Sequence, residues 1–290
     1  MTSLVIGASG LVGSALYRAL GGAAVGTYRS RAVEGLIPLD ARDDAALTRV
    51  VDDVAPQIVF FPAAEPNVDW CELHPSEAYA ANVRPALSAL GISRARGAAF
   101  VFFSSDYVFD GEAGPYDEAA PTHPLSVYAD QKREVEERVL EAEGTVVRTT
   151  TVFGSEHPPG KNFVIRLVAR LRSGEEATVP RDQYSTPTWS DELALAAIAV
   201  ARRGGIWHAA GPDYLARDAF ARLIADVFAV DPSLVRPVTT AELRQPARRP
   251  MRSGLRTEKL RRETGVTFLP LRTTLERFRD IPLGVAPKAD

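Results

Sequence analysis

The chain has 290 residues, 46% hydrophobic and 24% charged, a balance typical of a globular protein with one large domain or a domain and a smaller lobe. The formal net charge of −3 leaves no basic excess to neutralise phosphates, which argues against a general nucleic-acid binder. Apolar runs stay well short of the roughly 18 residues of a membrane span, so we expect no membrane partner.

The chain begins with an apolar strand pattern and lacks the basic leader of a secretion signal. Cys71, the single cysteine, cannot form an intrachain disulfide. It also lacks the second cluster of Cys or His ligands that a metal site needs, so no metal site is expected. These features predict a cytoplasmic protein.

In the first half of the chain, apolar runs alternate with amphipathic stretches, the pattern of βαβ units. Strands are predicted at 3–6, 24–28, 57–61, 98–103 and 145–149, with a further short strand before Asp40. Helical spacing is found at 11–20, 45–54, 75–94 and 126–143. The expected fold class is α/β, a Rossmann-type doubly wound parallel sheet.

Beyond residue 154 the pattern becomes irregular. We predict a loop at 155–160, helices at 162–172, 191–202 and 216–228, and a strand at 205–210 that returns to the main sheet. Prolines separate short elements from 233 onward. The predicted organisation is a nucleotide-binding domain at 1–154, to which 183–212 returns, and a smaller, discontinuous substrate lobe at 155–182 and 213–290.

A glycine-rich turn lies between the first predicted strand and helix. Gly7 permits a tight turn, Gly10 lets the backbone approach a pyrophosphate, and Gly13 lets the helix pack closely on the sheet. Ser9 and Leu11 belong to the same turn, where free N–H groups and the helix dipole favour an anion. Three glycines can also simply mark a turn, but this context favours dinucleotide binding.

The residues after the second strand bear on the choice of dinucleotide. NAD-binding proteins usually carry a carboxylate there, whereas this chain has Arg29 and Arg31, which suit the 2′-phosphate of NADPH. The alternative is that both are exposed loop residues, and NADH stays open. Asp40 is a candidate contact to the adenine, and Asp43 is expected to serve a helix N-terminus.

Three downstream residues suit proton transfer. Tyr128 and Lys132 are one helical turn apart, so the lysine charge can favour the phenolate of the tyrosine. Ser104 and Ser105 end the preceding strand, and Ser105 can hold a carbonyl oxygen. Reduction of a ketone requires hydride from a cofactor and a proton from the protein. Together with the glycine turn, these residues predict nicotinamide-dependent carbonyl chemistry.

These motifs resemble those of the extended short-chain dehydrogenase/reductases, and within them the dTDP-4-dehydrorhamnose reductase group. The resemblance runs nearly end to end. Residues 103–111, FSSDYVFDG, are similar to the group's STDYVFDG signature, and PLSVY at 124–128 introduces the catalytic helix in the same way. Further similar segments are VRT at 147–149, NF at 162–163, STPT at 185–188 and RPMRS at 249–253.

The resemblance implies roles for individual residues. Ser105, Tyr128 and Lys132 would form the catalytic trio, with Tyr128 and Lys132 also contacting the cofactor. On the cofactor side it implies Ala63, Ala64 and, as a support of the catalytic region, Asn82. Candidate substrate contacts are Asp106, Tyr107, Asn162, Gln183, Arg249 and Ser253. Asp106 could orient a substrate or the serine pair, or equally cap the turn after its strand, and Tyr107 could be a buried aromatic.

Two departures from the group concern the substrate. The group's RTSWVYG run reads RTTTVFG at 148–154, so Thr151 replaces a tryptophan expected near the sugar. The loop at 65–70, EPNVDW, differs from the usual YTAVD form. Trp70 in this loop could compensate for the missing ring or could pack beneath the loop.

The expected activity is NADPH-dependent reduction of a nucleotide-linked 4-keto-6-deoxy sugar, with Tyr128 as proton donor. One alternative is a reductase or epimerase of another nucleotide sugar; the missing carboxylate after the second strand argues against the epimerase. Another is a non-catalytic NADP-binding subunit similar to the regulator of methionine adenosyltransferase. Binding of Mg²⁺ stays open, although the sequence does not require it. Family members often form dimers, which leaves a homodimer open.

Overall fold

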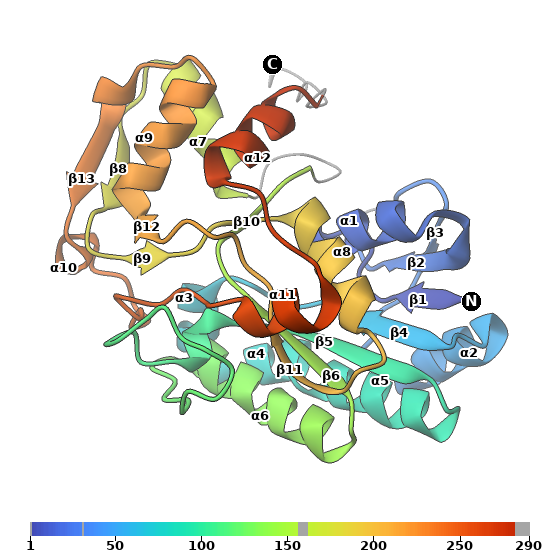
Figure 1. Ribbon diagram of the computed structural model, residues 1–290. Helices are drawn as coiled ribbons and strands as arrows, with labels where there is room; N and C mark the ends of the chain where they lie inside the picture. Colours follow the sequence, from blue (N-terminus) through green and yellow to red (C-terminus); the bar gives the residue numbers. More distant parts are fainter. Residues whose placement is uncertain (1, 31, 156–161, 282–290) are drawn as a thin grey trace.

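The computed structural model describes residues 2–30, 32–155 and 162–281, and its centre is a parallel sheet between two layers of helices (Figure 1). In this described part the sheet has seven strands in the order β11-β6-β5-β4-β1-β2-β3. The strands are β1 (Ser3–Val5), β2 (Ala24–Tyr28), β3 (Leu36–Pro38), β4 (Ile58–Phe61), β5 (Ala99–Ser105), β6 (Thr145–Thr149) and β11 (Gly205–His208). The order reverses between β1 and β4, so the predicted Rossmann-type topology is confirmed.

Seven helices accompany the sheet within the described ranges. They are α1 (Leu11–Leu20), α2 (Asp44–Val54), α3 (Val68–Leu73), α4 (Pro75–Asn82), α5 (Arg84–Ala95), α6 (Val127–Glu141) and α8 (Ser190–Val200). The stretch 75–94, predicted as helical, is two helices separated at Val83, with Pro85 in the first turn of α5. Proline has no N–H and is tolerated in a first turn, which favours a new helix start here.

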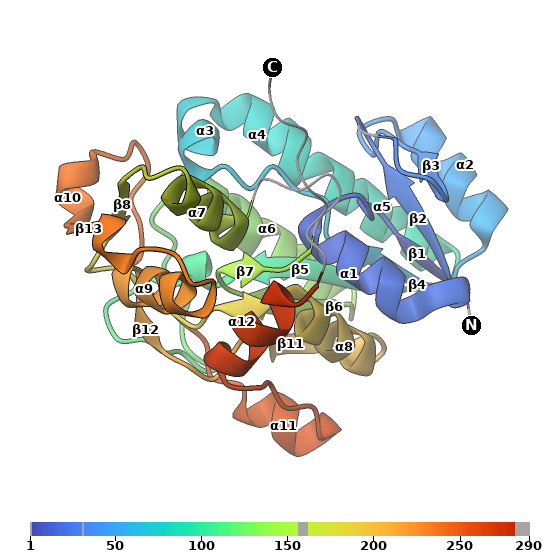
Figure 2. The same ribbon diagram turned by 90° about the horizontal axis from the view of Figure 1, so that it is seen from above.

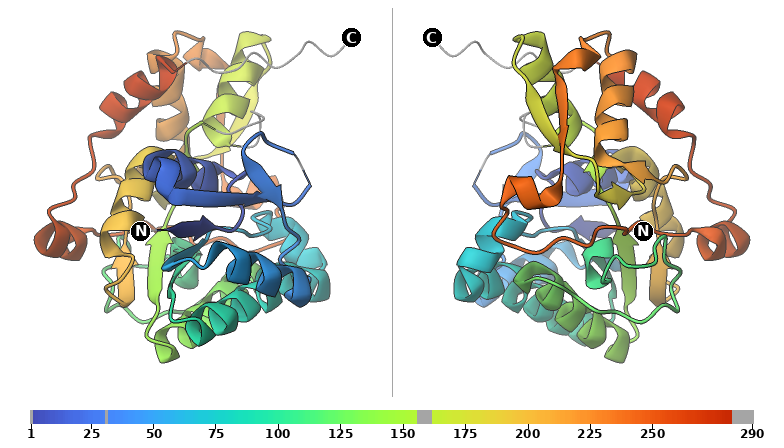
Figure 3. Two further views of the ribbon diagram at one scale, coloured as in Figure 1. Left: turned by 90° about the vertical axis from the view of Figure 1, so that its right-hand side faces the viewer. Right: turned by 90° about the vertical axis from the view of Figure 1, so that its left-hand side faces the viewer.

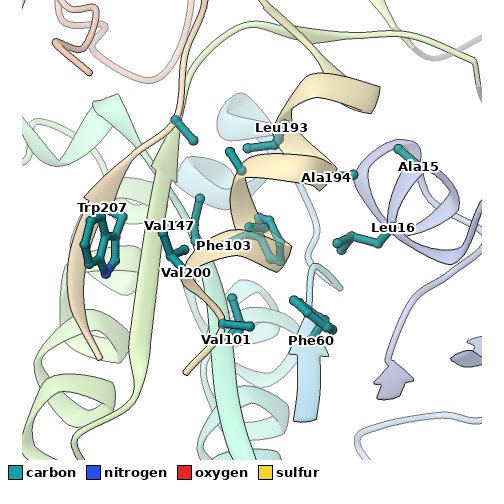
Figure 4. Close-up of a cluster of buried hydrophobic side chains, with 14 of the residues drawn as sticks. Ala15, Leu16, Phe60, Val101, Phe103, Val147, Leu193, Ala194, Val200 and Trp207 are labelled. Atoms are coloured by element: carbon teal, nitrogen blue, oxygen red, sulfur yellow. The ribbon is translucent and has the colours of Figure 1, made fainter. Parts of the chain in front are cut away.

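Alternate residues of each strand face opposite layers, as the two-residue period of a strand requires. Val5, Phe60, Val101, Phe103 and Val147 pack toward α1 and α8. Figure 4 shows this cluster, in which Ala15 and Leu16 of α1 and Leu193 and Ala194 of α8 lie beside the strand residues. The opposite cluster packs toward α2, α5 and α6 and contains Leu4, Val59, Phe61, Phe100, Phe102 and Val146. Figure 2 shows the two helical layers from above.

A second group of elements lies beside the sheet and has its own apolar core. It contains α7 (Phe163–Arg172), β8 (Ala177–Pro180), α9 (Arg217–Val227), β13 (Val235–Val238) and α12 (Leu271–Arg279). β8 pairs in parallel with β13, and Phe153, Phe220 and Phe278 meet beneath the helices. Figure 3 shows this lobe above the sheet.

Short elements connect the lobe to the sheet. They are β7 (Val152–Phe153), β9 (Tyr184–Ser185), β10 (Thr188–Trp189), β12 (Leu215–Ala216), α10 (Thr240–Leu243) and α11 (Glu258–Thr264). β10 pairs with β7, and β12 pairs with β9. Leu260 of α11 belongs to the apolar cluster of the main sheet, not to the core of the lobe. The assignment of each segment to a functional domain stays a prediction.

Candidate active site

The glycine turn joins β1 to α1 at the carboxyl end of the sheet. Gly7 has a positive φ of 94°, and its N–H donates to Thr27 Oγ1 of β2 at 3.0 Å. The Gly10 N–H donates to the Gly7 carbonyl at 3.0 Å, and α1 begins at the next residue. Ser9 and Leu11, both half-buried, flank Gly10. The turn therefore holds the N-terminus of α1 directly after β1, where backbone N–H groups favour an anion.

The glycines of this turn leave no room for side chains. A Cβ on Gly13 would lie 2.1 Å from the Gly7 carbonyl oxygen, and one on Gly7 would lie 3.0 Å from Ala63 Cβ. A Cβ on Gly10, in contrast, would meet protein only at 3.4 Å. Gly13 thus allows the close packing of helix and turn, while Gly10 leaves its backbone approachable. Ala63 lies against the turn, with Ala64 next to it in the segment after β4.

The residues predicted to select the dinucleotide lie after β2 and β3. Arg29 is exposed directly after β2, while Arg31 lies outside the described residues. Asp40 accepts hydrogen bonds from Arg42, and their ion pair of 2.5 Å holds the pKa of Asp40 at about 2, with a smaller contribution from Arg29. Asp43 caps α2 by accepting from the N–H groups of Ala45 and Ala46, as expected. A contact of Asp40 with adenine stays a prediction.

Ser105, Tyr128 and Lys132 come from two neighbouring elements. Ser105 is the last residue of β5, and the other two lie on the first turns of α6. The ammonium group of Lys132 donates to the Phe103 carbonyl of β5 at 2.8 Å. It also lies 4.7 Å from the centre of the Phe102 ring and 5.7 Å from that of the Tyr128 ring. The lysine therefore joins the catalytic helix to the end of β5.

Burial changes the ionisation of both residues on α6. It raises the pKa of the Tyr128 hydroxyl, and the nearby Cys71 and Tyr107 add smaller contributions in the same direction. It lowers the pKa of Lys132 to about 8, against an opposing effect of Glu136. The sequence predicted that Lys132 would favour the phenolate. In this structure, desolvation is the largest effect on the Tyr128 pKa and acts in the opposite direction, because it favours the neutral hydroxyl.

Asp106 is a buried carboxylate that links Ser105 to the lobe. Ser105 Oγ donates to Asp106 Oδ1 at 3.2 Å, while Thr150 and Ser253 donate to Oδ2 at 2.7 and 2.5 Å. Ser105, not Asp106, caps the following 3₁₀ turn by accepting from the Tyr107 N–H. Burial raises the pKa of Asp106 although its donors act in the opposite direction. The hydrogen bonds therefore fit a role of Asp106 in orienting Ser105 better than a role in capping the turn.

The remaining predicted substrate residues are spread over the sheet and the lobe. Tyr107 packs edge-on against Tyr128, with ring centres 6.3 Å apart. Asn162 caps α7 by accepting from the Ile165 N–H, and it donates to the Gly154 carbonyl. Gln183 donates to Thr240 and Gln245 within the lobe. These contacts explain the local structure and leave substrate binding by the three residues a prediction.

Arg249 and Asn82 support the segment after β4. Arg249 forms an ion pair of 2.9 Å with Asp69 of α3. Asn82 is buried and accepts from the Glu65 N–H at 2.7 Å, while its amide nitrogen donates to Gln131 of α6 at 3.2 Å. Asn82 therefore connects the loop at 65–70 with the helix that carries Tyr128 and Lys132.

The two departures noted in the sequence have different surroundings. Trp70 stacks on His74, with ring centres 5.0 Å apart. Thr151 has a positive φ of 42°, unusual for a β-branched residue, and its hydroxyl donates to Ser185 Oγ at 2.9 Å. Arg217 of the lobe donates to the same Thr151 hydroxyl at 3.3 Å. Nothing in the sequence marks Arg217, because it becomes part of this site only through the tertiary fold.

Comparison with known proteins identifies the family. A family model described as the RmlD substrate binding domain matches residues 1–281. The chain belongs to the RmlD family. Its RmlD relatives include a dTDP-4-dehydrorhamnose reductase of Streptomyces griseus, 37% identical over 266 residues, or 87% of this chain and 84% of the relative.

Two further proteins are similar to this RmlD-family chain. A crystal structure of a dTDP-4-dehydrorhamnose reductase of Bacillus anthracis in complex with NADP has a TM-score of 0.86 and 27% identity, covering 96% of this chain and 99% of that one. Methionine adenosyltransferase 2 subunit beta of Xenopus laevis is 30% identical over 250 residues, or 82% of this chain and 75% of that protein. None of the described helices combines the length and apolar character needed to traverse a lipid bilayer.

Proposed function

We propose that the protein uses NADPH to reduce the 4-keto group of a nucleotide-linked 4-keto-6-deoxy sugar of the dTDP type. The observation that carries this proposal is the position of Tyr128, whose hydroxyl lies on the helix that Lys132 ties to the end of β5. Membership of the RmlD family and the 37% identical reductase support the same activity. We expect it to act in the cytoplasm, as the single cysteine suggests.

The turn at residues 7–13 fits a dinucleotide, because a side chain at Gly13 would displace its backbone. Gly7, Gly10 and the N-terminus of α1 would bind the pyrophosphate, and Lys132 the nicotinamide ribose. Arg29 would bind the 2′-phosphate. Bound NADPH would supply the hydride that forms the new C–H bond.

The protein supplies the proton and orients the carbonyl group. Tyr128 donates its hydroxyl proton to the carbonyl oxygen, so the ketone becomes a secondary alcohol. Ser105 donates a hydrogen bond to the same oxygen and stabilises its growing negative charge. In the structure the Ser105 hydroxyl donates to Asp106 at 3.2 Å, which positions the serine, and when the carbonyl group binds this proton turns from Asp106 to the carbonyl oxygen. The positive charge of Lys132 stabilises the phenolate that Tyr128 leaves behind.

The Tyr128→Phe variant tests this proposal directly. Because it removes only the hydroxyl, we expect kcat to fall by about 10²- to 10⁴-fold while the Kd for NADPH stays unchanged. The assay follows loss of NADPH absorbance with enzymatically generated dTDP-4-keto-6-deoxy sugar, and NADPH affinity is measured by fluorescence titration. Unchanged turnover would exclude Tyr128 as the proton donor.

A second candidate is a non-catalytic NADP-binding subunit. Its support is the 30% identity to a methionine adenosyltransferase subunit and the replacement of a tryptophan by Thr151. The hydrogen-bonded Ser105 and the neighbouring Tyr128 and Lys132 favour the reductase. Clear NADPH binding without turnover of any nucleotide-linked keto sugar would favour the subunit instead.

A further inference from the structure

Arg217 is a cation in an electrostatically unfavourable place. It is the first residue of α9, where the unpaired N–H groups of a helix already carry partial positive charge. Its backbone N–H donates to the Gln183 carbonyl at 2.8 Å, which fixes the start of the helix. Taken alone, a positive charge at a helix N-terminus is unfavourable for folding, which suggests that the charge of Arg217 serves a function.

The guanidinium group is held by neutral groups. It lies 4.2 Å from the centre of the Phe163 ring, and Nη1 donates to Thr151 Oγ1 at 3.3 Å. Within residues 2–30, 32–155 and 162–281, Arg217 forms no ion pair, whereas Arg249 near the same site is paired with Asp69. Burial lowers the pKa of the Arg217 guanidinium, with only partial compensation by Tyr107 and Asp106. The positive charge is therefore largely unneutralised.

The surroundings of Arg217 connect it to the reacting groups. Thr151 follows Thr150, which donates to Asp106, and Asp106 in turn holds Ser105. The charge of Arg217 acts to lower the pKa of Tyr107, against the larger effect of burial, and the Tyr107 ring packs against that of Tyr128. Figure 1 shows α9 beside α7 in the lobe, and the Phe163 ring of α7 meets Phe220 of α9 at 5.7 Å. The guanidinium thus lies on the lobe, toward the proposed catalytic residues.

We propose that Arg217 binds the diphosphate of the nucleotide sugar. The inference rests on the proposed function, in which the substrate carries a diphosphate on the sugar that is reduced. A guanidinium group can donate two parallel hydrogen bonds to phosphate oxygens, and the N–H groups that begin α9 favour the same anion. Arg217 is half-buried, and the Thr151 hydroxyl and the Phe163 ring hold its guanidinium group in place.

The test measures the affinity of NADPH-saturated enzyme for dTDP, dTMP and thymidine by calorimetry. Replacing Arg217 by Met keeps an unbranched side chain against Phe163 and removes the charge. We expect Arg217→Met to weaken dTDP binding by about 10- to 100-fold, as for loss of a charged hydrogen-bond donor. Thymidine binding should change less than about twofold, with dTMP between the two, and Arg217→Lys should retain part of the preference for dTDP.

Arg272→Ala is the matched control. Arg272 is an exposed arginine of the same lobe that pairs with Asp226 of α9 at 2.7 Å, and its loss should leave all three affinities unchanged. Melting temperatures of every variant show whether it is folded. If Arg217→Met weakens thymidine as much as dTDP, Arg217 has a structural role and the inference is wrong. Unchanged dTDP affinity overturns it as well.

Failure of the proposed function gives a different result. Wild-type enzyme that binds UDP in place of dTDP refutes the dTDP assignment, and UDP and uridine then replace dTDP and thymidine in the comparison. If the wild-type enzyme binds dTDP and Arg217→Met weakens this binding, but no keto sugar is reduced, then only the proposed reduction is wrong. If the wild-type enzyme binds no nucleoside diphosphate, both the inference and the nucleotide-sugar substrate are wrong.

Discussion

Tyr128 and Lys132 illustrate how burial determines the chemistry of individual residues. The same desolvation raises the pKa of the tyrosine and lowers that of the lysine to about 8, because it disfavours the charged form of each. Helical spacing in the sequence places the two residues on one face. It does not reveal how deeply either is buried, so the direction of the tyrosine shift could not be predicted from spacing alone.

The lowered pKa of Lys132 predicts a limit to activity at alkaline pH. Below about pH 8 the ammonium group is charged and can stabilise the phenolate of Tyr128; above it, the charge is lost. Tyr128 keeps its proton in this range, because its own pKa is raised. We therefore expect kcat/KM for reduction to fall as the pH rises through about 8. A pH profile of kcat/KM measures this directly, since it reports ionisations of the free enzyme.

Two substitutions assign that limit to Lys132. Arginine stays charged throughout the range, so Lys132→Arg should lose activity overall but show no fall near pH 8. Lys132→Met should be weakly active with a flat profile. An alkaline limit that persists in Lys132→Arg would show that another group is responsible.

Asp106 shows where residue-level reasoning from sequence ends. The sequence left it between orienting a substrate or the serine pair and capping a turn, because a carboxylate next to Ser105 suits each of these roles. Its other partners are far away in the chain: Thr150 follows β6 of the main sheet, and Ser253 lies 147 residues beyond Asp106. Long-range hydrogen bonds of this kind leave no local pattern in the sequence.

At the scale of whole elements, the first half of the fold follows directly from sequence. The predicted ranges 11–20, 24–28 and 145–149 coincide with α1, β2 and β6. α1 follows from its helical spacing, and β6, which is buried throughout, reads as a short run bounded by Gly144. The lobe is less predictable. β7, β9, β10 and β12 have two residues each, too few to show a period of their own, and β8 pairs with a strand more than 50 residues later.

The glycine turn yields a prediction about stability. Gly13→Ala would place a Cβ 2.1 Å from the Gly7 carbonyl oxygen, so α1 must move away from the turn. Forced overpacking of this kind typically lowers the free energy of unfolding by about 1–3 kcal/mol. The displaced turn should also lose most of its NADPH affinity. Denaturant unfolding and NADPH titration measure the two effects.

Gly91 provides the matched control within a helix. It is exposed in α5, and a Cβ there would meet nothing within 4 Å. Gly91→Ala should raise the free energy of unfolding by up to about 1 kcal/mol, since alanine is the better helix former, and leave NADPH binding unchanged. If Gly13→Ala is as stable as the wild type, the close contact of turn and helix is not the reason for glycine at position 13.

For the whole molecule, the sheet and the lobe are joined by polar contacts around the proposed site. Ser253 donates to Asp106, Thr151 to Ser185, and the Arg252 N–H to the Gly111 carbonyl. Ligands that contact both parts should therefore stabilise the entire fold. The glycine turn and the Tyr-Lys pair predict this arrangement in outline, whereas the charge that the lobe contributes through Arg217 emerges only from the assembled structure.

Ligand-induced stabilisation also tests the choice of dinucleotide. A ligand at 100 times its Kd stabilises the folded state by about 2.7 kcal/mol. Arg29 is exposed at the end of β2, where it can reach a 2′-phosphate that NADPH has and NADH lacks. If Arg29→Ala weakens NADPH binding about tenfold, stabilisation at the same NADPH concentration drops by about 1.3 kcal/mol. Thermal unfolding with each dinucleotide measures the difference.

Stabilisation by NADH should not change in Arg29→Ala. Arg94 is an exposed arginine of α5, and Arg94→Ala should alter stabilisation by neither dinucleotide. Equal losses for NADPH and NADH would mean that Arg29 does not recognise the 2′-phosphate.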